Sequence, residues 1–251
     1  MKNIKDNIID KNSKFEYNKT VKLNISGSRQ AKSAIRLYKI ISHDTSQMQS
    51  ANLINLTRIC LDFIQKCTNE KLDMIYKNYE RKHLSVDKFY DYINEMKPVE
   101  YFCAHNSKNP NQLNETCIHY GNGMLALTDE NKKEETHIGL LILLKNYFID
   151  KDEIIKFINA IYNIIDIDYG NIFYSEHDQY VDIISEGKWQ KRLFSYSIKN
   201  MDYIKLDILN NVKNGSVPKI YKYNILNNNQ IKSLNINNSI KINENLHLYE
   251  E

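Results

Sequence analysis

The chain has 251 residues, which is enough for one large or two small domains with a buried core. Hydrophobic residues make up 42% and charged residues 26%, as in an ordinary globular protein. The first ten residues are too charged for a signal peptide, and the longest apolar run, 138–144, is too short to cross a membrane. We therefore expect a soluble, cytoplasmic protein whose four cysteines stay reduced.

Charge is segregated along the chain. Residues 129–186 are acidic overall, and residues 188–241 are basic overall. The basic residues stand singly among Ile, Leu, Tyr and Asn, without the arginine clusters of a nucleic-acid-binding segment. We expect the two segments to neutralise each other within one fold, or the acidic one to form a recognition face. Neither nucleic acid nor membrane is expected as a partner.

The first part of the chain predicts an arm and a strand. Residues 1–27 are polar and lead into the run Ser26-Gly27-Ser28, so they are interpreted as an N-terminal arm with at most a short strand at 20–25. Residues 28–251 are expected to form a single domain. The stretch AIRLYKII at 34–41 alternates in part between apolar and polar residues, which favours a strand.

Two helices are predicted next. Ser46 is the expected cap of a helix that runs to about Lys66. Ser85 begins a second helical pattern, and Pro98 marks its end. Steps of three and four residues place one apolar set on a single face of the first helix: Leu53, Leu56, Cys60, Phe63 and Cys67.

The middle of the chain predicts strands at 99–104, 116–128 and 136–148. The third is almost continuously apolar, which is typical of a central strand covered on both faces. Asp150 is a good N-cap for the helix that follows. Its expected inner face comprises Ile154, Ile155, Ile158, Ile161 and Ile165.

Further strands are expected at 169–174, 192–198, 218–227 and 240–249, whereas 203–209 fits either state. The order of strands around one helix predicts an α+β fold. We expect a mixed, mainly antiparallel sheet with helices packed on one face.

Two Cys-x-His pairs, Cys103/His105 and Cys117/His119, lie within twenty residues. Residues i and i+2 of a strand share a face, so two antiparallel neighbours would present all four side chains together. Zinc accepts two cysteines and two histidines, but structural zinc sites usually use a tight C-x2-C turn, which is missing here. Ordinary neighbouring strands without metal or cofactor are the favoured interpretation, and a zinc site is the alternative.

His177 lies between Glu176 and Asp178 after a predicted strand, where a general base is conceivable. No nucleophile is placed beside it, so a solvated or partner-binding loop is favoured. Trp189 is the sole tryptophan, and its expected role is a buried anchor or a binding hot spot. The familiar phosphate, dinucleotide and hydrolase motifs are missing, so we expect a protein that is not an enzyme.

One series of segments is familiar in its order. It consists of YGNGMLALTD, HIGLLILLKNYF, DEIIKFINAIYNII, DYGNIFYSEHD, VPKIYKYNILNNNQI and ENLHLYEE. This order resembles bacterial immunity proteins of polymorphic-toxin and contact-secretion systems, over about residues 95–251. The resemblance implies an α+β protein that binds one cognate toxin without catalysis. Because contact residues differ between members of such families, no site residue is transferred by position.

Three functions compete: a toxin-neutralising binding protein, a zinc protein or enzyme centred on the Cys-x-His pairs, and a phage- or host-encoded interaction module. For the first, acidic residues would meet a basic toxin, because opposite charge accelerates association. The expected contact residues are Glu134, Glu135, Glu176, His177, Asp178 and Asp182, with Trp189 as the apolar anchor.

Overall fold

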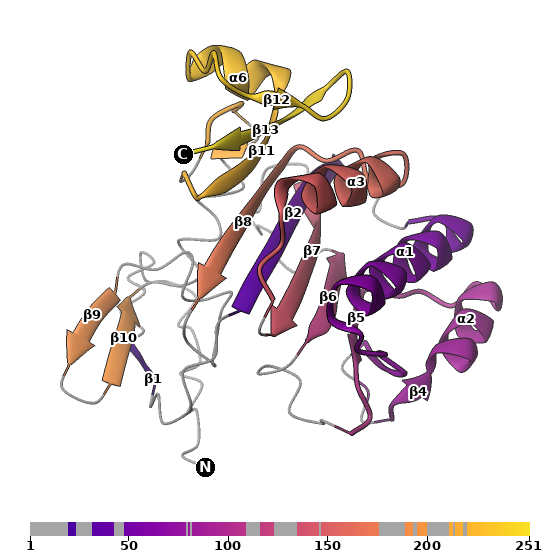
Figure 1. Ribbon diagram of the computed structural model, residues 1–251. Helices are drawn as coiled ribbons and strands as arrows, with labels where there is room; N and C mark the ends of the chain where they lie inside the picture. The colour runs from indigo at the N-terminus through magenta and orange to yellow at the C-terminus, as the bar shows by residue number, and fades with distance from the viewer. Residues whose placement is uncertain are drawn as a thin grey trace, which may run out of the picture.

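The computed structural model describes residues 20–23, 32–42, 48–78, 80, 82–108, 116–122, 135–145, 147–175, 189–192, 195–199, 211–212, 214–217 and 220–251. A ten-stranded sheet dominates this part of the chain (Figure 1). Its spatial order is β12 (Ile240–Lys241), β13 (Leu246–Glu250), β11 (Tyr223–Asn227), β8 (Tyr169–Ser175), β2 (Lys32–Ser42), β7 (Glu135–Lys145), β6 (Cys117–Asn122), β5 (Tyr101–His105), β3 (Met74–Lys77) and β4 (Leu84–Ser85). Each neighbouring pair in this order is antiparallel.

Strand β2 lies in the middle of the sheet, between β7 and β8. Ile35 pairs with Ile142 on one side and with Ile172 on the other. The interior position predicted for the 136–148 strand is confirmed, because β7 lies between β2 and β6. The predicted strands at 34–41 and 169–174 are confirmed as β2 and β8.

A smaller sheet contains β1 (Thr20–Leu23), β10 (Ser195–Lys199) and β9 (Trp189–Arg192), in that order. The prediction of one strand at 192–198 is wrong, since β9 and β10 are two strands that pair antiparallel. The last predicted strand, at 240–249, is likewise two strands, β12 and β13, that pair with each other. In both places the apolar pattern continues across a reversal of the chain, so alternation alone does not show the turn. The stretches 123–128 and 203–209 lie outside the described residues.

Three helices cover the same face of the large sheet (Figure 1): α1 (Ser50–Thr68), α2 (Val86–Asn94) and α3 (Lys151–Tyr162). Their apolar residues share one core with alternate residues of the strands, among them Ile35, Phe102 and Ile142. The predicted α+β fold is thereby confirmed. The short α6 (Asn228–Ser233) packs instead through Ile231 with Tyr169 and Leu226, which point to the opposite face.

The helix caps follow the sequence with one exception. Ser85 Oγ accepts a hydrogen bond from the Lys88 amide at 3.4 Å, as predicted for the start of α2. Asp150 and Glu153 form a reciprocal capping box at α3. The predicted cap of α1, Ser46, is wrong: the helix begins at Ser50, and the Gln49 carbonyl accepts its first hydrogen bond from Leu53.

The inner faces of the helices match the predicted periodicity closely. Leu53, Leu56 and Cys60 of α1 are buried, whereas Phe63 and Cys67 are partly buried. The buried residues of α3 are Ile154, Phe157, Ile158 and Ile161, with Ile155 only partly buried. Within the described residues, no helix combines the length and the apolar character needed to cross a bilayer.

Candidate functional site

The four residues of the two Cys-x-His pairs lie on one face of β5 and β6. Alternation along the strands sends Phe102, Ala104, Ile118 and Tyr120 into the core beneath the helices. Cys103, His105, Cys117 and His119 therefore point to the other face. This confirms the prediction that neighbouring antiparallel strands present the four side chains together.

Cys103 and His119 are direct partners across β5 and β6. The Cys103 sulfur lies 3.9 Å from His119 Nε2, and the Tyr101 hydroxyl lies 2.9 Å from His119 Nδ1. Tyr101 reaches the imidazole because it precedes Cys103 by two residues and shares its face. The imidazole is thus held between a thiol and a phenol, each next to a different ring nitrogen.

The side chains around Cys103 change the pKa of its thiol. Its pKa lies well below the ordinary value of a thiol, chiefly because the Cys117 side chain hydrogen bonds to it. Burial acts in the opposite direction, and the hydrogen bond and charge of His119 reinforce the lowering. We call Cys103, Cys117 and His119, with Tyr101 behind the imidazole, the thiol cluster.

A pair of histidines adjoins the thiol cluster. His83 Nδ1 lies 2.9 Å from His105 Nε2, and His105 Nδ1 lies 3.2 Å from the Asn106 carbonyl oxygen. The second contact requires a proton on His105 Nδ1, so in the neutral state His105 Nε2 accepts a hydrogen bond from His83. Tyr76 packs edge-on against His83 and Tyr101, which joins the two groups into one aromatic surface.

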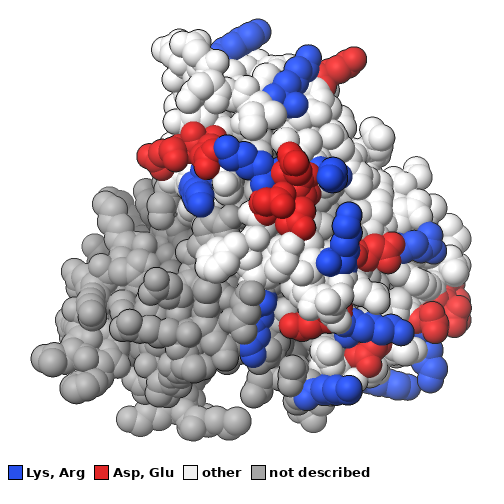
Figure 2. Space-filling model, viewed as in Figure 1, with Lys and Arg blue, Asp and Glu red and all other residues white. Residues whose placement is uncertain are grey.

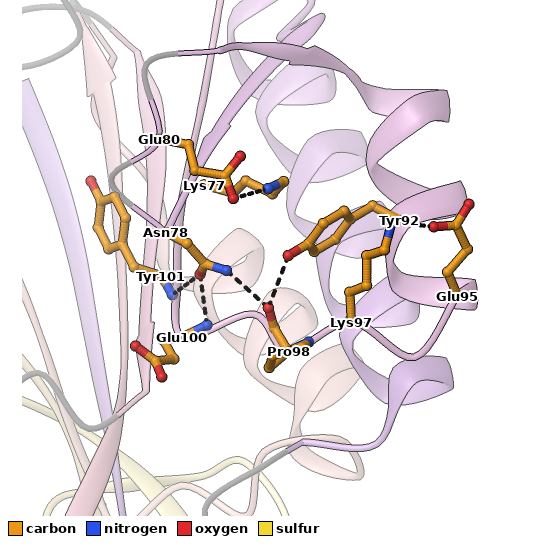
Figure 3. A network of polar contacts seen from close by, with 9 residues as sticks. All are labelled: Lys77, Asn78, Glu80, Tyr92, Glu95, Lys97, Pro98, Glu100 and Tyr101. Atoms are coloured by element: carbon orange, nitrogen blue, oxygen red, sulfur yellow. Dashed lines mark hydrogen bonds and ion pairs between the residues drawn. The ribbon is translucent and has the colours of Figure 1, made fainter.

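The start of β5 is fixed by Asn78 (Figure 3). Its Oδ1 accepts hydrogen bonds from the amides of Glu100 and Tyr101, at 2.9 and 3.3 Å, and its Nδ2 donates to the Pro98 carbonyl at 2.9 Å. Asn78 has a φ of 43°, a left-handed conformation that asparagine tolerates well. The network therefore sets the position of Tyr101 from outside the cluster.

Lys77, next to this network, is a buried cation on the helix-covered face. Its ammonium pairs with the Glu80 carboxylate and lies 3.9 Å from the centre of the Tyr92 ring (Figure 3). The Tyr92 hydroxyl donates to the Pro98 carbonyl at 3.4 Å. Lys77 thus links α2 to β3 beside Asn78.

The zinc alternative predicted four ligands in one tetrahedral set. The structure places the four side chains on one face but divides them between two groups, since His105 pairs with His83 and His119 with Cys103. Within the described residues, no group of three or more His, Cys, Asp or Glu side chains is arranged to hold a metal ion.

The other two cysteines have the opposite electrostatic character. Cys60 and Cys67 lie on α1, where burial raises the pKa of both thiols, that of Cys67 to about 11. Their interpretation as small packing residues fits these positions. One chain therefore carries two cysteines that resist ionisation and one that is poised for it.

The predicted contact residues lie largely outside the described part of the chain: Glu134, Glu176, His177, Asp178 and Asp182. Trp189 belongs to β9, where its backbone pairs with Ile198, and its side chain is not described. Glu135 begins β7 opposite Ser42, whereas Ser175 ends β8 opposite Lys32. The two halves of the predicted surface thus start from opposite ends of β2.

Sequence reasoning did not predict the exposure of Phe148. Phe148, three residues after the end of β7, is 63% exposed. It follows Lys145, whose partner Lys32 also pairs with Ser175, so Phe148 lies at the end of the sheet from which the Glu176 segment departs. The exposure was not predicted because the apolar pattern of residues 136–148 placed Phe148 inside the preceding strand.

Comparison with known proteins does not assign the chain to a family. No family model matches the chain, and no curated protein matches it. One solved structure, the Pseudomonas aeruginosa T6SS protein PA0821, aligns with a TM-score of 0.47 and 6% sequence identity. The alignment covers 89% of this chain and 66% of that one, just under two thirds of its length. At these values the likeness demonstrates neither a shared fold nor a shared function.

Proposed function

We propose that this protein binds a cognate bacterial protein toxin and neutralises it without catalysing a reaction. Support comes first from the sequence resemblance, whose segments supply β6, β7, α3, β8, β11 and β13 in that order. These elements form two parts of one sheet that are joined through β2. The proposal therefore concerns a scaffold built on one sheet, with binding residues at its edges and ends.

The observation that carries the proposal is the exposed phenylalanine at one end of this scaffold. Phe148 is 63% exposed, and its neighbours Asp150 and Asp152 are exposed carboxylates. Binding hot spots are enriched in large side chains surrounded by a polar rim. Phe148 replaces Trp189 as the proposed apolar anchor, and the segment from Glu176 remains the proposed acidic rim.

The chain on either side of Phe148 is held in place. The Tyr147 hydroxyl donates to Glu153 Oε1 at 2.6 Å, and the Ser33 hydroxyl donates to the Tyr147 carbonyl. Ile149 is buried in the core beneath the helices. Because the chain on both sides of Phe148 is fixed, little backbone entropy is lost when this residue binds, which favours affinity.

Charge on the visible face of the molecule is mixed. Figure 2 shows acidic and basic side chains interspersed over the side that carries α1, α2 and α3. Attraction of a basic toxin would therefore depend on the local carboxylates near Phe148. Such rim charges mainly accelerate association, and their effect falls as salt shortens the Debye length to about 8 Å at physiological ionic strength.

The test is co-expression with the product of the adjacent gene, followed by measurement of growth and of binding by the purified proteins. We expect the neighbour to be toxic and this protein to restore growth. Phe148→Ala should weaken binding at least tenfold, chiefly through faster dissociation. A neighbour that is harmless, or that this protein neither binds nor neutralises, would refute the proposed function.

The matched control is Met96→Ala. Met96 is 85% exposed, but it lies between α2 and β5, near the end of the sheet opposite Phe148. This variant should bind as wild type does. Charge reversal at Asp152, Glu176 and Asp178 should slow association and reduce its dependence on salt. If binding survives Phe148→Ala and is lost in Met96→Ala, the function stands and the surface is misplaced.

A further inference from the structure

The thiol cluster has a composition that toxin binding does not use. Two cysteine side chains are in hydrogen-bond contact, and a histidine 3.9 Å from one of them is steadied by a tyrosine hydroxyl. We infer that Cys103 and Cys117 form a reversible redox pair, in which Cys103 reacts with a peroxide and Cys117 then closes a disulfide. This inference does not depend on the proposed toxin.

The first step needs an ionised sulfur and a proton donor, and both are present. His119 takes the Cys103 proton, and the hydrogen bond from Cys117 stabilises the resulting thiolate, consistent with the lowered pKa of Cys103. The thiolate attacks one oxygen of hydrogen peroxide, so an S–O bond forms and the O–O bond breaks. The departing hydroxide takes the proton from His119 and leaves as water, and Cys103 becomes a sulfenic acid.

The second step uses Cys117, whose thiol donates the hydrogen bond to the Cys103 sulfur. Its sulfur attacks the sulfenic sulfur, an S–S bond forms, and the S–O bond breaks. The released hydroxide combines with the Cys117 proton as a second water molecule. The two thiols together lose two electrons and two protons to one peroxide.

The sheet register explains why the disulfide would be reversible. Cys103 faces His119, so Cys117 is its diagonal neighbour across β5 and β6. Diagonal residues have Cα atoms about 7–8 Å apart. Most disulfides span about 4.4–6.8 Å. Closing a bond across this diagonal therefore requires the backbones of β5 and β6 to move together, and the bond formed is strained. Strain raises the reduction potential and makes the bond easy for a cellular dithiol to reduce.

The same chain supplies internal controls on α1. Burial raises the pKa of Cys60 and Cys67, so both remain thiols at neutral pH. Cys60 is as buried as Cys103, with 0% exposure for each. A difference in reactivity between these two cysteines therefore reports the environment of the sulfur rather than its exposure.

The experiment treats the reduced, folded wild-type protein with hydrogen peroxide and follows each cysteine by isotope-coded alkylation and peptide mapping. We expect the protein to lose two hydrogen atoms in mass, with Cys103 and Cys117 linked, and dithiothreitol to reverse the change. Cys60 and Cys67 should stay reduced under the same conditions. Oxidation of Cys60 at the rate of Cys103, or no reaction of Cys103 until the protein is unfolded, would overturn the inference.

Variants of Cys117 and His119 separate the roles of these two side chains. In Cys117→Ser, the Cys103 sulfenic acid should persist and be trapped by dimedone. In His119→Gln, the rate of alkylation of Cys103 should fall at least tenfold at pH 6–7, and its pH profile should move toward that of an ordinary thiol. Circular dichroism confirms that each variant is folded. An unchanged pH profile in a folded His119→Gln protein would contradict the assigned role of the imidazole.

Discussion

The two faces of the sheet use the same strands for different purposes. On β5 and β6, the residues beneath the helices are Phe102, Ala104, Ile118 and Tyr120, all fully buried. The residues between them, on the opposite face, are two cysteines and two histidines with hydrogen-bond partners. A single strand alternation therefore separates a packing surface from one that carries hydrogen-bonded, ionisable side chains.

This difference teaches that burial alone does not define the role of a residue here. Cys103 and Ile118 are both 0% exposed. Ile118 belongs to the large apolar core, whereas Cys103 has a histidine and a cysteine beside it that favour its ionised form. Substitutions on the helix-covered face should therefore change stability above all, and substitutions on the other face should change titration and reactivity.

The largest contrast is expected between Leu140→Ala and Leu141→Ala, adjacent residues of β7 that receive the same substitution. Leu140 is 1% exposed beneath the helices, whereas Leu141 is partly exposed on the other face. Leu140→Ala should lower the free energy of unfolding by about 2–5 kcal/mol because it leaves a cavity. Leu141→Ala should cost clearly less, and urea denaturation measures both. Equal losses would show that the two faces are packed alike.

A smaller loss is expected where β8 approaches β2. A Cβ atom at Gly170 would lie 2.6 Å from Leu37 Cδ2 and 3.0 Å from the Arg36 carbonyl oxygen. Gly170→Ala should therefore destabilise the protein by about 1–3 kcal/mol through overpacking. In a double variant with Leu37→Val, the two losses should be less than additive in the same denaturation assay. Strict additivity would contradict the close approach.

The next prediction concerns pH and compares wild type with Cys103→Ala. The folded pKa of Cys103 is lowered from 9.0, so its ionised form adds stability that is fully present above the unfolded value and is lost as pH falls through the folded one. The stability advantage of wild type should rise between pH 6 and 9 by up to about 1.4 kcal/mol per pH unit. Urea denaturation across this range measures the difference.

Cys60→Ala is the control for this pH dependence. Burial raises the pKa of Cys60 above 9.0, so its contribution is constant below that value and is lost only as the solution becomes more alkaline. Wild type and Cys60→Ala should therefore differ by a constant amount between pH 6 and 8. A flat difference for Cys103→Ala over the same range would remove the distinction between the two faces.

The smallest change in stability is expected when a tyrosine hydroxyl is removed, and its sign should differ between the two faces of the sheet. Tyr120 is buried beneath the helices, and its hydroxyl has no hydrogen-bond partner among the residues that the structure describes. Tyr120→Phe should therefore stabilise the protein by about 1 kcal/mol, because an unsatisfied polar atom is removed. Tyr101→Phe should destabilise it by about 0.5–1.5 kcal/mol through the lost contact with His119. Thermal unfolding of the two variants decides whether the signs differ.

Local patterns predicted most of the fold. The capping box at Asp150, the cap at Ser85 and the apolar runs of β2 and β7 each depend on neighbouring residues, which a sequence displays directly. Strand order is different, because it depends on contacts between distant segments. Nothing local indicates that β2 enters between β7 and β8, or that the stretch 240–249 reverses into a hairpin.

The candidate site was predicted in part. Period-two spacing correctly brought the two Cys-x-His pairs to one face, and the same rule applied to Tyr101 would have added the phenol beside His119. His83 was out of reach of this reasoning, since it precedes α2 and meets His105 only through the pairing of β3 with β4 and β5. The exposure of Phe148 depends on where β7 ends, the least certain feature of any strand pattern.

The central position of β2 in the sheet has a consequence for the synthesis of the protein on the ribosome. Ile35 is translated more than a hundred residues before its two partners, Ile142 and Ile172. At about 5–20 residues per second, β2 waits on the order of ten seconds before both of its edges can pair. During that interval the nascent chain exposes a strand with two unpaired edges, the kind of segment that chaperones protect from aggregation.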